Sequence, residues 1–327
     1  MDEHAYNERP AQSQSGATAV PMPPVTAGKV QEALAALLQL YGKGDGNRGI
    51  CSVSLLGKSF WDAEIPLIRI GQGEKAILYV GGHHGMETVT SAVLLRFAFE
   101  LCEAAAKGRR LYNVSCEYLV RHRSIYILPL LNPDGAMIAA GGLTPASPFY
   151  ERILKMNGGG EDFSHWQANG RGVDLNHNYN AGFGECKQME AREGIFSGCP
   201  SKYSGEYPES EPETAALCSF LRKTLPRFTL TLHTQGEEIY YSSMGKTLPK
   251  TASFARAMAK MTGYRLGTPT GSAAYGGLTD WMIGELSLPC FTLECGKGEN
   301  PLPPESLVGI YGRIRELLFT GPILFGS

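Results

Sequence analysis

Two kinds of hydrophobic pattern alternate along the first third of the chain. Residues 30–43 and 86–107 carry apolar side chains three and four positions apart, which is the spacing of an amphipathic helix. Residues 52–57, 65–71 and 74–82 instead form the alternating or continuous apolar runs of β-strands, and the last run stops at two glycines, as buried central strands do. This part of the chain therefore predicts a helix, three strands and a long second helix.

Three more apolar runs, at residues 124–131, 227–234 and 289–296, indicate further buried strands. Helical spacing recurs between and after them. The segments concerned are residues 208–223, which open with prolines and acids as helix N-termini favour, and residues 251–261 and 305–319. Strands that alternate with helices predict a three-layer α/β/α fold around a mixed, mostly parallel sheet.

The two ends of the sequence differ in composition. Residues 1–26 are rich in Ala, Pro, Ser and Gln and have no periodic apolar face, so we expect a disordered N-terminal tail. Residues 27–327 contain no linker and should form one catalytic domain. The tail lacks the basic and apolar regions of a signal peptide, and no later segment is long enough to span a bilayer. We therefore expect a cytoplasmic protein without a membrane partner.

Composition and charge narrow the class of protein. The 327 residues are 43% hydrophobic, enough for a substantial core, and the net charge of -2 gives no broad basic surface for nucleic acid. The eight cysteines form no CxxC pair and are expected to be free thiols. Cys186 and Cys199, which flank an expected loop, are the only pair considered for a disulfide. A small or peptide substrate fits this composition best, and the oligomeric state is not indicated.

Three residues at expected strand ends are candidate metal ligands. His84 and Glu87 follow the strand at residues 74–82, with Glu87 placed on the first turn of the next helix, and His233 ends the strand at residues 227–234. Zinc prefers imidazole nitrogen and carboxylate oxygen, and a catalytic site supplies three protein ligands. An HxxE tetrapeptide alone also occurs by chance, and a lone histidine beside a strand is often only hydrogen-bonded structure.

A series of motifs makes the zinc interpretation stronger. In chain order, GGHHGMET, NPDG, RGVDLNHN, YSGEYPESEPET, LHTQGEEIYY, GGLTDW and FTLECG resemble the zinc carboxypeptidases over residues 50–300. This resemblance implies a zinc-dependent peptidase that holds one Zn²⁺ through His84, Glu87 and His233 and acts on a peptide.

The same resemblance implies roles for two acidic residues. Glu294, in FTLE, matches the family's catalytic glutamate, which takes a proton from the activated water and returns it to the leaving amine. Asp174, in RGVDLN, resembles the aspartate that accepts the second ring N–H of the first histidine ligand and fixes its tautomer. An acid at the end of an apolar strand is costly to bury without such a role.

Two further residues are implied to contact the substrate. Arg171 resembles the arginine that polarises the scissile carbonyl and stabilises the oxyanion, although Trp166-Gln167 can be aligned to the same loop instead. Asn176 resembles the asparagine that helps to hold the terminal carboxylate of the substrate.

The chain departs from the pancreatic-type pattern at the substrate end of the site. His177 stands where those relatives have an arginine, and a histidine cannot clamp a carboxylate as a permanent bidentate fork. The family's active-site tyrosine falls on Ser272, with Tyr275 close by as a replacement or as a core residue. Leu278 and Thr279 occupy the specificity pocket, which therefore lacks an acid for basic side chains.

A narrower resemblance accounts for these departures. HTQGEEIYY, SAAYGGLTDW and ECGKGENPLP look like the bacterial gamma-D-glutamyl-L-meso-diaminopimelate peptidases, which implies a muropeptide substrate cut at that bond, with Asn176 and His177 recognising a carboxylate. An ordinary metallocarboxypeptidase or a non-peptide amide deacylase of the same fold remains the alternative. Two histidines and a carboxylate also occur in iron oxygenases, but the helices and Glu294 argue against that class. A non-enzymatic wall-binding protein is the other rival.

Overall fold

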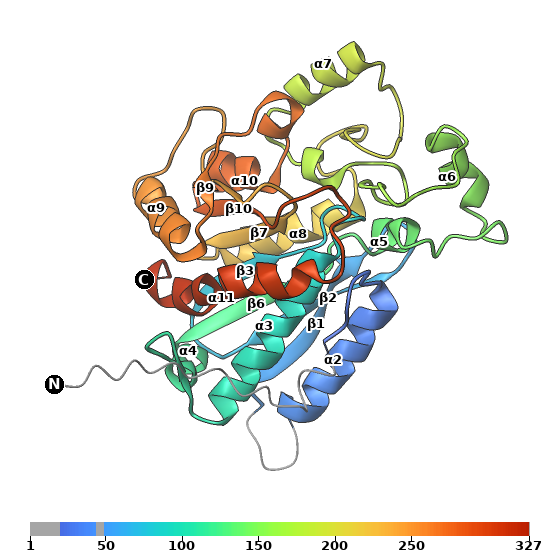
Figure 1. Cartoon of the computed structure of the whole chain (residues 1–327). Helices are drawn as coiled ribbons and strands as arrows, with labels where there is room; N and C mark the ends of the chain where they lie inside the picture. Colours follow the sequence, from blue (N-terminus) through green and yellow to red (C-terminus); the bar gives the residue numbers. More distant parts are fainter. Residues whose placement is uncertain (1–19, 44–48, 327) are drawn as a thin grey trace.

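The computed structural model describes residues 20–43 and 49–326, and its centre is an eight-stranded sheet (Figure 1). The strand order is β1-β2-β6-β3-β7-β10-β8-β9. The strands β6, β3, β7 and β10 are parallel to one another, whereas β1–β2, β2–β6 and β10–β8 pair antiparallel. The bounds are β1 (Cys51–Lys58), β2 (Glu64–Ile70), β3 (Lys75–Val80), β6 (Arg123–Leu128), β7 (Thr229–His233), β8 (Glu238–Tyr240), β9 (Arg265–Leu266) and β10 (Cys290–Glu294).

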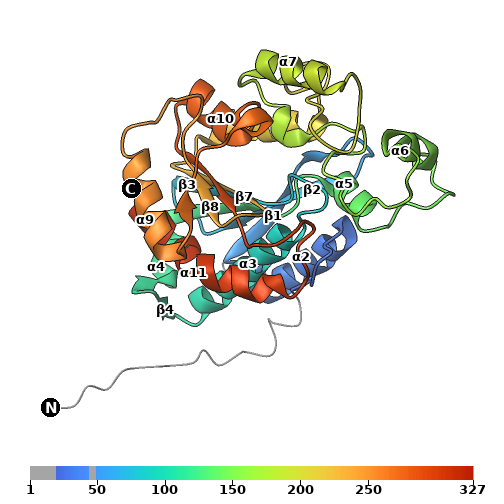
Figure 2. The same cartoon turned by 45° about the horizontal axis from the view of Figure 1, so that its top comes forward.

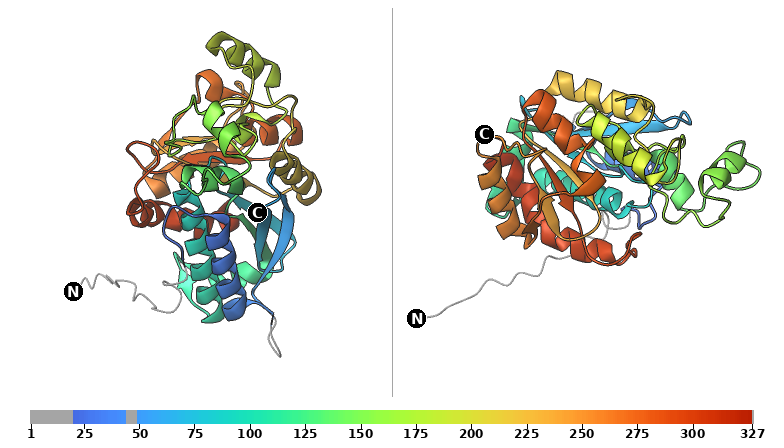
Figure 3. Two further views of the ribbon diagram at one scale, coloured as in Figure 1. Left: turned by 90° about the vertical axis from the view of Figure 1, so that its right-hand side faces the viewer. Right: turned by 90° about the horizontal axis from the view of Figure 1, so that it is seen from above.

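Helices cover both faces of the sheet, as Figures 2 and 3 show. One layer holds α2 (Ala27–Tyr41), α3 (Val89–Ala106), α4 (Cys116–His122), α9 (Thr251–Thr262) and α11 (Ser306–Leu324). The opposite layer holds α8 (Pro212–Thr224), α10 (Leu278–Trp281) and the π-helical turn Met282–Leu286. The remaining elements are α5 (Pro133–Ala139), α6 (Tyr150–Met156), α7 (Phe183–Glu193), the 3-10 turns Leu175–His177 and Gly271–Ala274, and the hairpin of β4 (Arg110–Leu111) and β5 (Val114–Ser115). The predicted three-layer α/β fold is confirmed.

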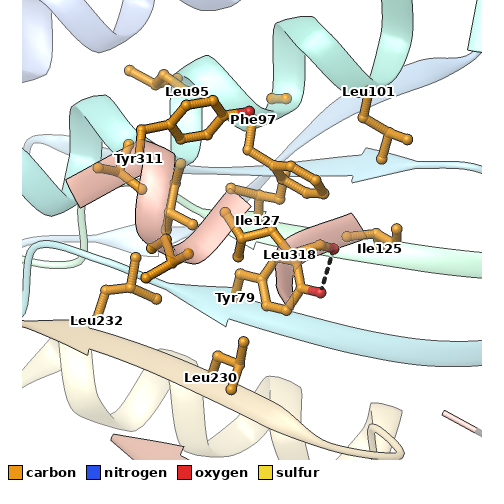
Figure 4. Close-up of a cluster of buried hydrophobic side chains, with 14 of the residues drawn as sticks. Tyr79, Leu95, Phe97, Leu101, Ile125, Ile127, Leu230, Leu232, Tyr311 and Leu318 are labelled. Carbon is orange, nitrogen blue, oxygen red and sulfur yellow. Dashed lines mark hydrogen bonds between the residues drawn. The ribbon is translucent and has the colours of Figure 1, made fainter. Parts of the chain in front are cut away.

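The side-chain period of β3 explains why both faces are buried. Ile77 and Tyr79 enter the core beneath α3 and α11, whereas Leu78 and Val80 enter the core beneath α8 and α10. In the first core the Tyr79 hydroxyl donates a hydrogen bond of 3.0 Å to the backbone oxygen of Leu318 in α11 (Figure 4). An unbroken apolar run is what a strand buried on both faces requires.

The four parallel strands end at one edge of the sheet. β7 and β10 pair in register, so that His233 lies opposite Glu294 at their last positions. β3 lies on the other side of β7, and its carboxyl end leads into the segment that carries His84. The convergence of strand ends expected from the sequence is therefore present, and it is where an open α/β sheet usually carries its site.

Several expectations are refined. Of the expected tail at residues 1–26, residues 1–19 lie outside the described residues, and Val25 is fully buried in the core. All eight cysteines are free, including Cys186 and Cys199. Within the described ranges, none of the helices has the length and apolar character to cross a membrane.

Candidate metal centre and active site

His84, Glu87 and His233 come together as one cluster. One ligand atom from each residue lies within 4.8 Å of the others. The Nδ1 atom of His84 is 2.9 Å from Oε1 of Glu87, and Nδ1 of His233 is 3.2 Å from Oε2 of the same carboxylate. Two imidazole nitrogens and one carboxylate converging on a common point are a donor set for Zn²⁺ that leaves one coordination position to solvent.

The backbone between β3 and α3 places the first two ligands. The N–H of Glu87 donates to the oxygen of His84 in a turn, and the Thr90 hydroxyl donates to the oxygen of Glu87. Gly85 fits because a Cβ atom there would lie 2.4 Å from the backbone of Gly135. The prediction that Glu87 stands on the first helical turn is wrong: α3 begins at Val89, and the turn that shapes the ligand pair precedes it.

Buried acids make this cluster suitable for a cation. Burial opposes ionisation of Glu87, but the neighbouring His84 and His233 outweigh it and lower its pKa to about 2. Asp174 is buried as well; burial opposes its ionisation, yet His84 and His177 hold its pKa far below the usual range. Two ionised carboxylates in a buried site favour a metal ion, so the residues present fit zinc.

Asp174 lies where the second ring nitrogen of His84 needs a hydrogen-bond partner. Its Oδ1 lies 3.3 Å from Nε2 of His84, a nitrogen with no hydrogen bond of good geometry among the described residues. The carboxylate is itself held by the backbone N–H groups of Asn176 and Lys202, each at 3.1 Å. Such a contact selects the tautomer of His84 in which Nδ1 is free to bind metal.

Glu294 ends β10 beside this cluster. Its side chain is partly exposed and makes no hydrogen bond or ion pair within the described part of the chain. Burial, and next the charge of Glu87, raise its pKa to about 8, while the positive charge of a bound Zn²⁺ would lower it. A carboxyl that exchanges its proton near neutrality is suited to general acid–base work.

Arg171 lies in a different environment from the metal ligands. Its Nε atom is 3.2 Å from Oε2 of the buried Glu211, and its guanidinium group stacks 4.2 Å above the Phe60 ring. It lines a cavity of about 580 Å³ whose walls include no residue of the metal cluster. The backbone oxygen of Gln167, by contrast, accepts a hydrogen bond from the N–H of Gly85 next to His84. The oxyanion role of Arg171 stays a prediction.

The residues predicted at the substrate end form one neighbourhood around Asn176. Its side-chain oxygen accepts a hydrogen bond of 3.1 Å from the N–H of Leu278, tying it to the segment that carries Tyr275 and Thr279. His177 is nearly buried, with Nε2 4.0 Å from Oδ2 of Asp174 and Nδ1 3.9 Å from the sulfur of Cys186. Their substrate contacts remain predictions.

Tyr275 and Thr279, the two residues predicted on this segment, already contact other parts of the protein. The Tyr275 ring packs against Gly182, where an added Cβ would lie 2.7 Å from it. The Thr279 hydroxyl lies 2.8 Å from that of Thr292 on β10. Thr279 therefore faces the sheet and supplies no charge for a basic side chain.

Sequence reasoning missed three polar residues behind the metal ligands. Asn300 exchanges two hydrogen bonds with Thr234, the residue after His233. His83 and Thr231 form contacts with His233 itself. The signals were available: His83 is adjacent to a ligand, and Thr231 shares a strand face with His233 because it lies two positions before it.

Comparisons with known proteins agree with this geometry. The zinc carboxypeptidase family matches residues 45–312. The chain is 29% identical over 267 residues to gamma-D-glutamyl-L-diamino acid endopeptidase 1 of Lysinibacillus sphaericus, covering 81% of this chain and 66% of that protein. It is 26% identical to carboxypeptidase B of Homo sapiens, covering 76% of this chain and 58% of that protein. The chain thus spans less than two thirds of the length of these two relatives.

Solved structures share the fold. Carboxypeptidase A from Helicoverpa armigera matches with a TM-score of 0.65 at 20% identity, covering 91% of this chain and 72% of that one. Murein-tripeptide amidase MpaA from Escherichia coli O157 matches with a TM-score of 0.50 at 20% identity, covering 82% and 91%. The family match spans most of the chain and includes the three ligands, which confirms the resemblance drawn from the motifs. The chain belongs to the zinc carboxypeptidase family and is a zinc metallopeptidase.

Proposed function

We propose that this enzyme hydrolyses the bond between the γ-carboxyl group of D-glutamate and a diamino acid, meso-diaminopimelate, in peptides derived from bacterial cell walls. The observation that carries the proposal is the 29% identity, over 81% of this chain, to a relative named for its action on gamma-D-glutamyl-L-diamino acid bonds. The residues at the substrate end of the site support it, because they depart from those that bind ordinary C-terminal side chains.

The chain's own groups account for the proton transfers of such a hydrolysis. His84, Glu87 and His233 would hold the Zn²⁺, which would act as a Lewis acid and make a water more acidic. Glu294 stands beside the ligands with no hydrogen-bond or ion-pair partner among the described residues, so its carboxylate is available to accept the proton of the attacking water. The same carboxyl then donates that proton to the nitrogen of the departing amine.

Recognition of the diamino acid is assigned to Asn176 and His177. The side-chain oxygen of Asn176 is occupied by the N–H of Leu278, which leaves its NH₂ group to donate to a substrate carboxylate. His177 follows directly, with its Nε2 atom 4.0 Å from Oδ2 of Asp174, and a ring N–H of histidine can donate a hydrogen bond to a carboxylate. meso-Diaminopimelate carries a second carboxylate that these two residues can bind, whereas a C-terminal Phe offers only one.

The segment from Gly276 to Trp281, which includes the predicted specificity pocket, supports the same substrate class. Asp280 is the only acid between Gly276 and Trp281, and it is buried, with Oδ2 accepting the N–H of Gly277 at the start of α10. Since Thr279 faces Thr292, no carboxylate is free there to bind the side chain of a C-terminal Lys or Arg. This argues against a peptide that ends in Lys or Arg as the substrate.

The test compares two substrates with the zinc-loaded enzyme. We expect L-Ala-γ-D-Glu-meso-diaminopimelate to be cleaved to L-Ala-D-Glu and free diaminopimelate, identified by mass spectrometry, and hippuryl-Phe to be cleaved slowly or not at all. The Glu294→Gln variant is the control for contaminating peptidases. Cleavage of hippuryl-Phe alone would overturn the proposal and assign the enzyme to the ordinary carboxypeptidases.

A further inference from the structure

A row of buried polar side chains lies against His233 on the side opposite its metal-binding nitrogen. Nε2 of His233 is 3.2 Å from the hydroxyl of Thr231, and that hydroxyl is 3.3 Å from Nδ1 of His83. Nε2 of His83 is in turn 3.0 Å from the hydroxyl of Tyr179. His83, Thr231 and Tyr179 are fully buried, and His233 is 2% exposed.

The hydrogen-bonding atoms of this row contact one another, and no further partner is found for them in the described part of the chain. Among the described residues, neither hydroxyl and none of these ring nitrogens has a further hydrogen-bond partner. The rings of His83 and His233 also pack against each other at a tilt, with centroids 5.0 Å apart and planes at 31°. Because polar groups buried in this way are costly to leave unpaired, the row constrains the orientation of every ring in it.

The metal fixes the direction of the hydrogen bonds. A neutral imidazole that binds metal through Nδ1 carries its proton on Nε2, so His233 donates to the Thr231 oxygen. The Thr231 hydroxyl then donates to Nδ1 of His83, and Nε2–H of His83 donates to the Tyr179 oxygen. In this arrangement His83 uses Nδ1 as an acceptor and Nε2–H as a donor.

We propose that Thr231, His83 and Tyr179 are positioning residues that set the tautomer and ring orientation of the zinc ligand His233. They do for His233 what the Asp174 carboxylate does for His84, but through hydroxyl groups and a second imidazole ring. The inference depends on the metal site and not on the substrate proposed above, so a failure of either leaves the other intact.

The experiment measures the zinc dissociation constant of the folded full chain by competition with a chromogenic chelator. Thr231→Val removes the hydroxyl at constant shape, and we expect zinc affinity to fall about 10- to 100-fold, the usual effect of losing an outer contact to a metal ligand. Thr231→Ser keeps the hydroxyl and should restore affinity to near that of the wild type. The kcat of the fully zinc-loaded Thr231→Val enzyme should fall as well, with KM changing less.

The chain provides a matched control. Thr229 lies on the same face of β7, is equally buried, and has a hydroxyl without a hydrogen-bond partner. Thr229→Val should therefore leave zinc affinity unchanged. If Thr231→Val and Thr229→Val bind zinc equally well, the role of Thr231 is refuted.

Tyr179→Phe tests the far end of the row with a ring of the same shape. We expect its zinc affinity to fall by about tenfold, the lower end of the same range, because it acts through two intervening residues. The double variant Tyr179→Phe/Thr231→Val should bind about as weakly as Thr231→Val alone. The proposed role of the row would be refuted if the losses of zinc affinity in the two single variants were fully additive. An unchanged zinc affinity in Tyr179→Phe would also refute it, and this test does not require Thr231→Val to fold.

Discussion

A buried carboxyl at the start of α8 makes the stability of the enzyme depend on pH in a predictable way. Glu213 is fully buried; its Oε1 accepts the N–H of Phe60 at 3.0 Å, and its Oε2 lies 3.3 Å from the Nδ2 atom of Asn169. Burial raises the pKa of Glu213 from 4.5 to about 8; its own N–H and that of Phe60 oppose the rise, and the nearby acids Asp134 and Glu211 add to it.

The free energy of unfolding falls with rising pH because the pKa of Glu213 differs between the folded and the unfolded chain. A carboxyl whose pKa is higher in the folded protein contributes its full stability below pH 4.5, where both states carry the proton, and loses it as the pH rises through 8. Between these values the unfolded state ionises while the folded state does not, which costs about 1.4 kcal/mol per pH unit. The whole shift amounts to roughly 5 kcal/mol by about pH 9.

The assay is urea unfolding of zinc-loaded wild type and Glu213→Gln from pH 5 to 9. The glutamine resembles the protonated acid in shape, so it keeps the contact with Phe60 but cannot ionise. The free energy of unfolding of the wild type should fall relative to that of the variant by about 1.4 kcal/mol per pH unit up to pH 8. Glu206→Gln, at an exposed position, controls for the loss of one negative charge. Parallel curves for wild type and Glu213→Gln would refute the reasoning.

Other perturbations have equally definite outcomes. Glu294→Gln should lower kcat by about 10²- to 10⁴-fold while zinc affinity, measured by chelator competition, changes little, because the residue moves protons and does not bind metal; a comparable loss of zinc would contradict this. Removal of zinc by a chelator should abolish hydrolysis, and added Zn²⁺ should restore it. Asp174→Asn should weaken zinc binding about 10- to 100-fold, since the contact with Nε2 of His84 is perturbed. Arg171→Ala should destabilise the fold by about 1–3 kcal/mol, because it removes the cation beside the buried Glu211, which keeps hydrogen bonds from Asn169 and Ser210; thermal denaturation without such a loss would show that this ion pair contributes little.

The sequence sufficed for features that rest on local patterns. The apolar run that ends at Val80 is a strand because only an extended segment with both faces buried needs such a run, and its two glycines end it. The three zinc ligands were also predictable, because each residue type suits the metal, His233 ends a strand, and His84 and Glu87 follow another strand.

Contacts between segments far apart in the sequence were harder to predict. Nothing in the residues around Arg171 shows that its guanidinium stacks on Phe60 and pairs with Glu211, because these partners are 111 and 40 positions away and only the fold joins them. The position of Glu87 before α3 depends on a turn held by Thr90, which helical periodicity does not register. The row from His233 to Tyr179 likewise crosses three separate segments.

The in-register pairing of His233 with Glu294 means that the separation of this metal ligand from the proton acceptor is set by the spacing of two neighbouring strands, about 4.8 Å. A one-residue slip of either strand would turn its side chain to the other face, so the sheet itself protects this geometry. Asn176 and His177, which are assigned to the substrate, lie instead on the segment that connects α6 with α7. The sheet therefore fixes the geometry of hydrolysis, whereas substitutions in the loops can change which peptide is bound.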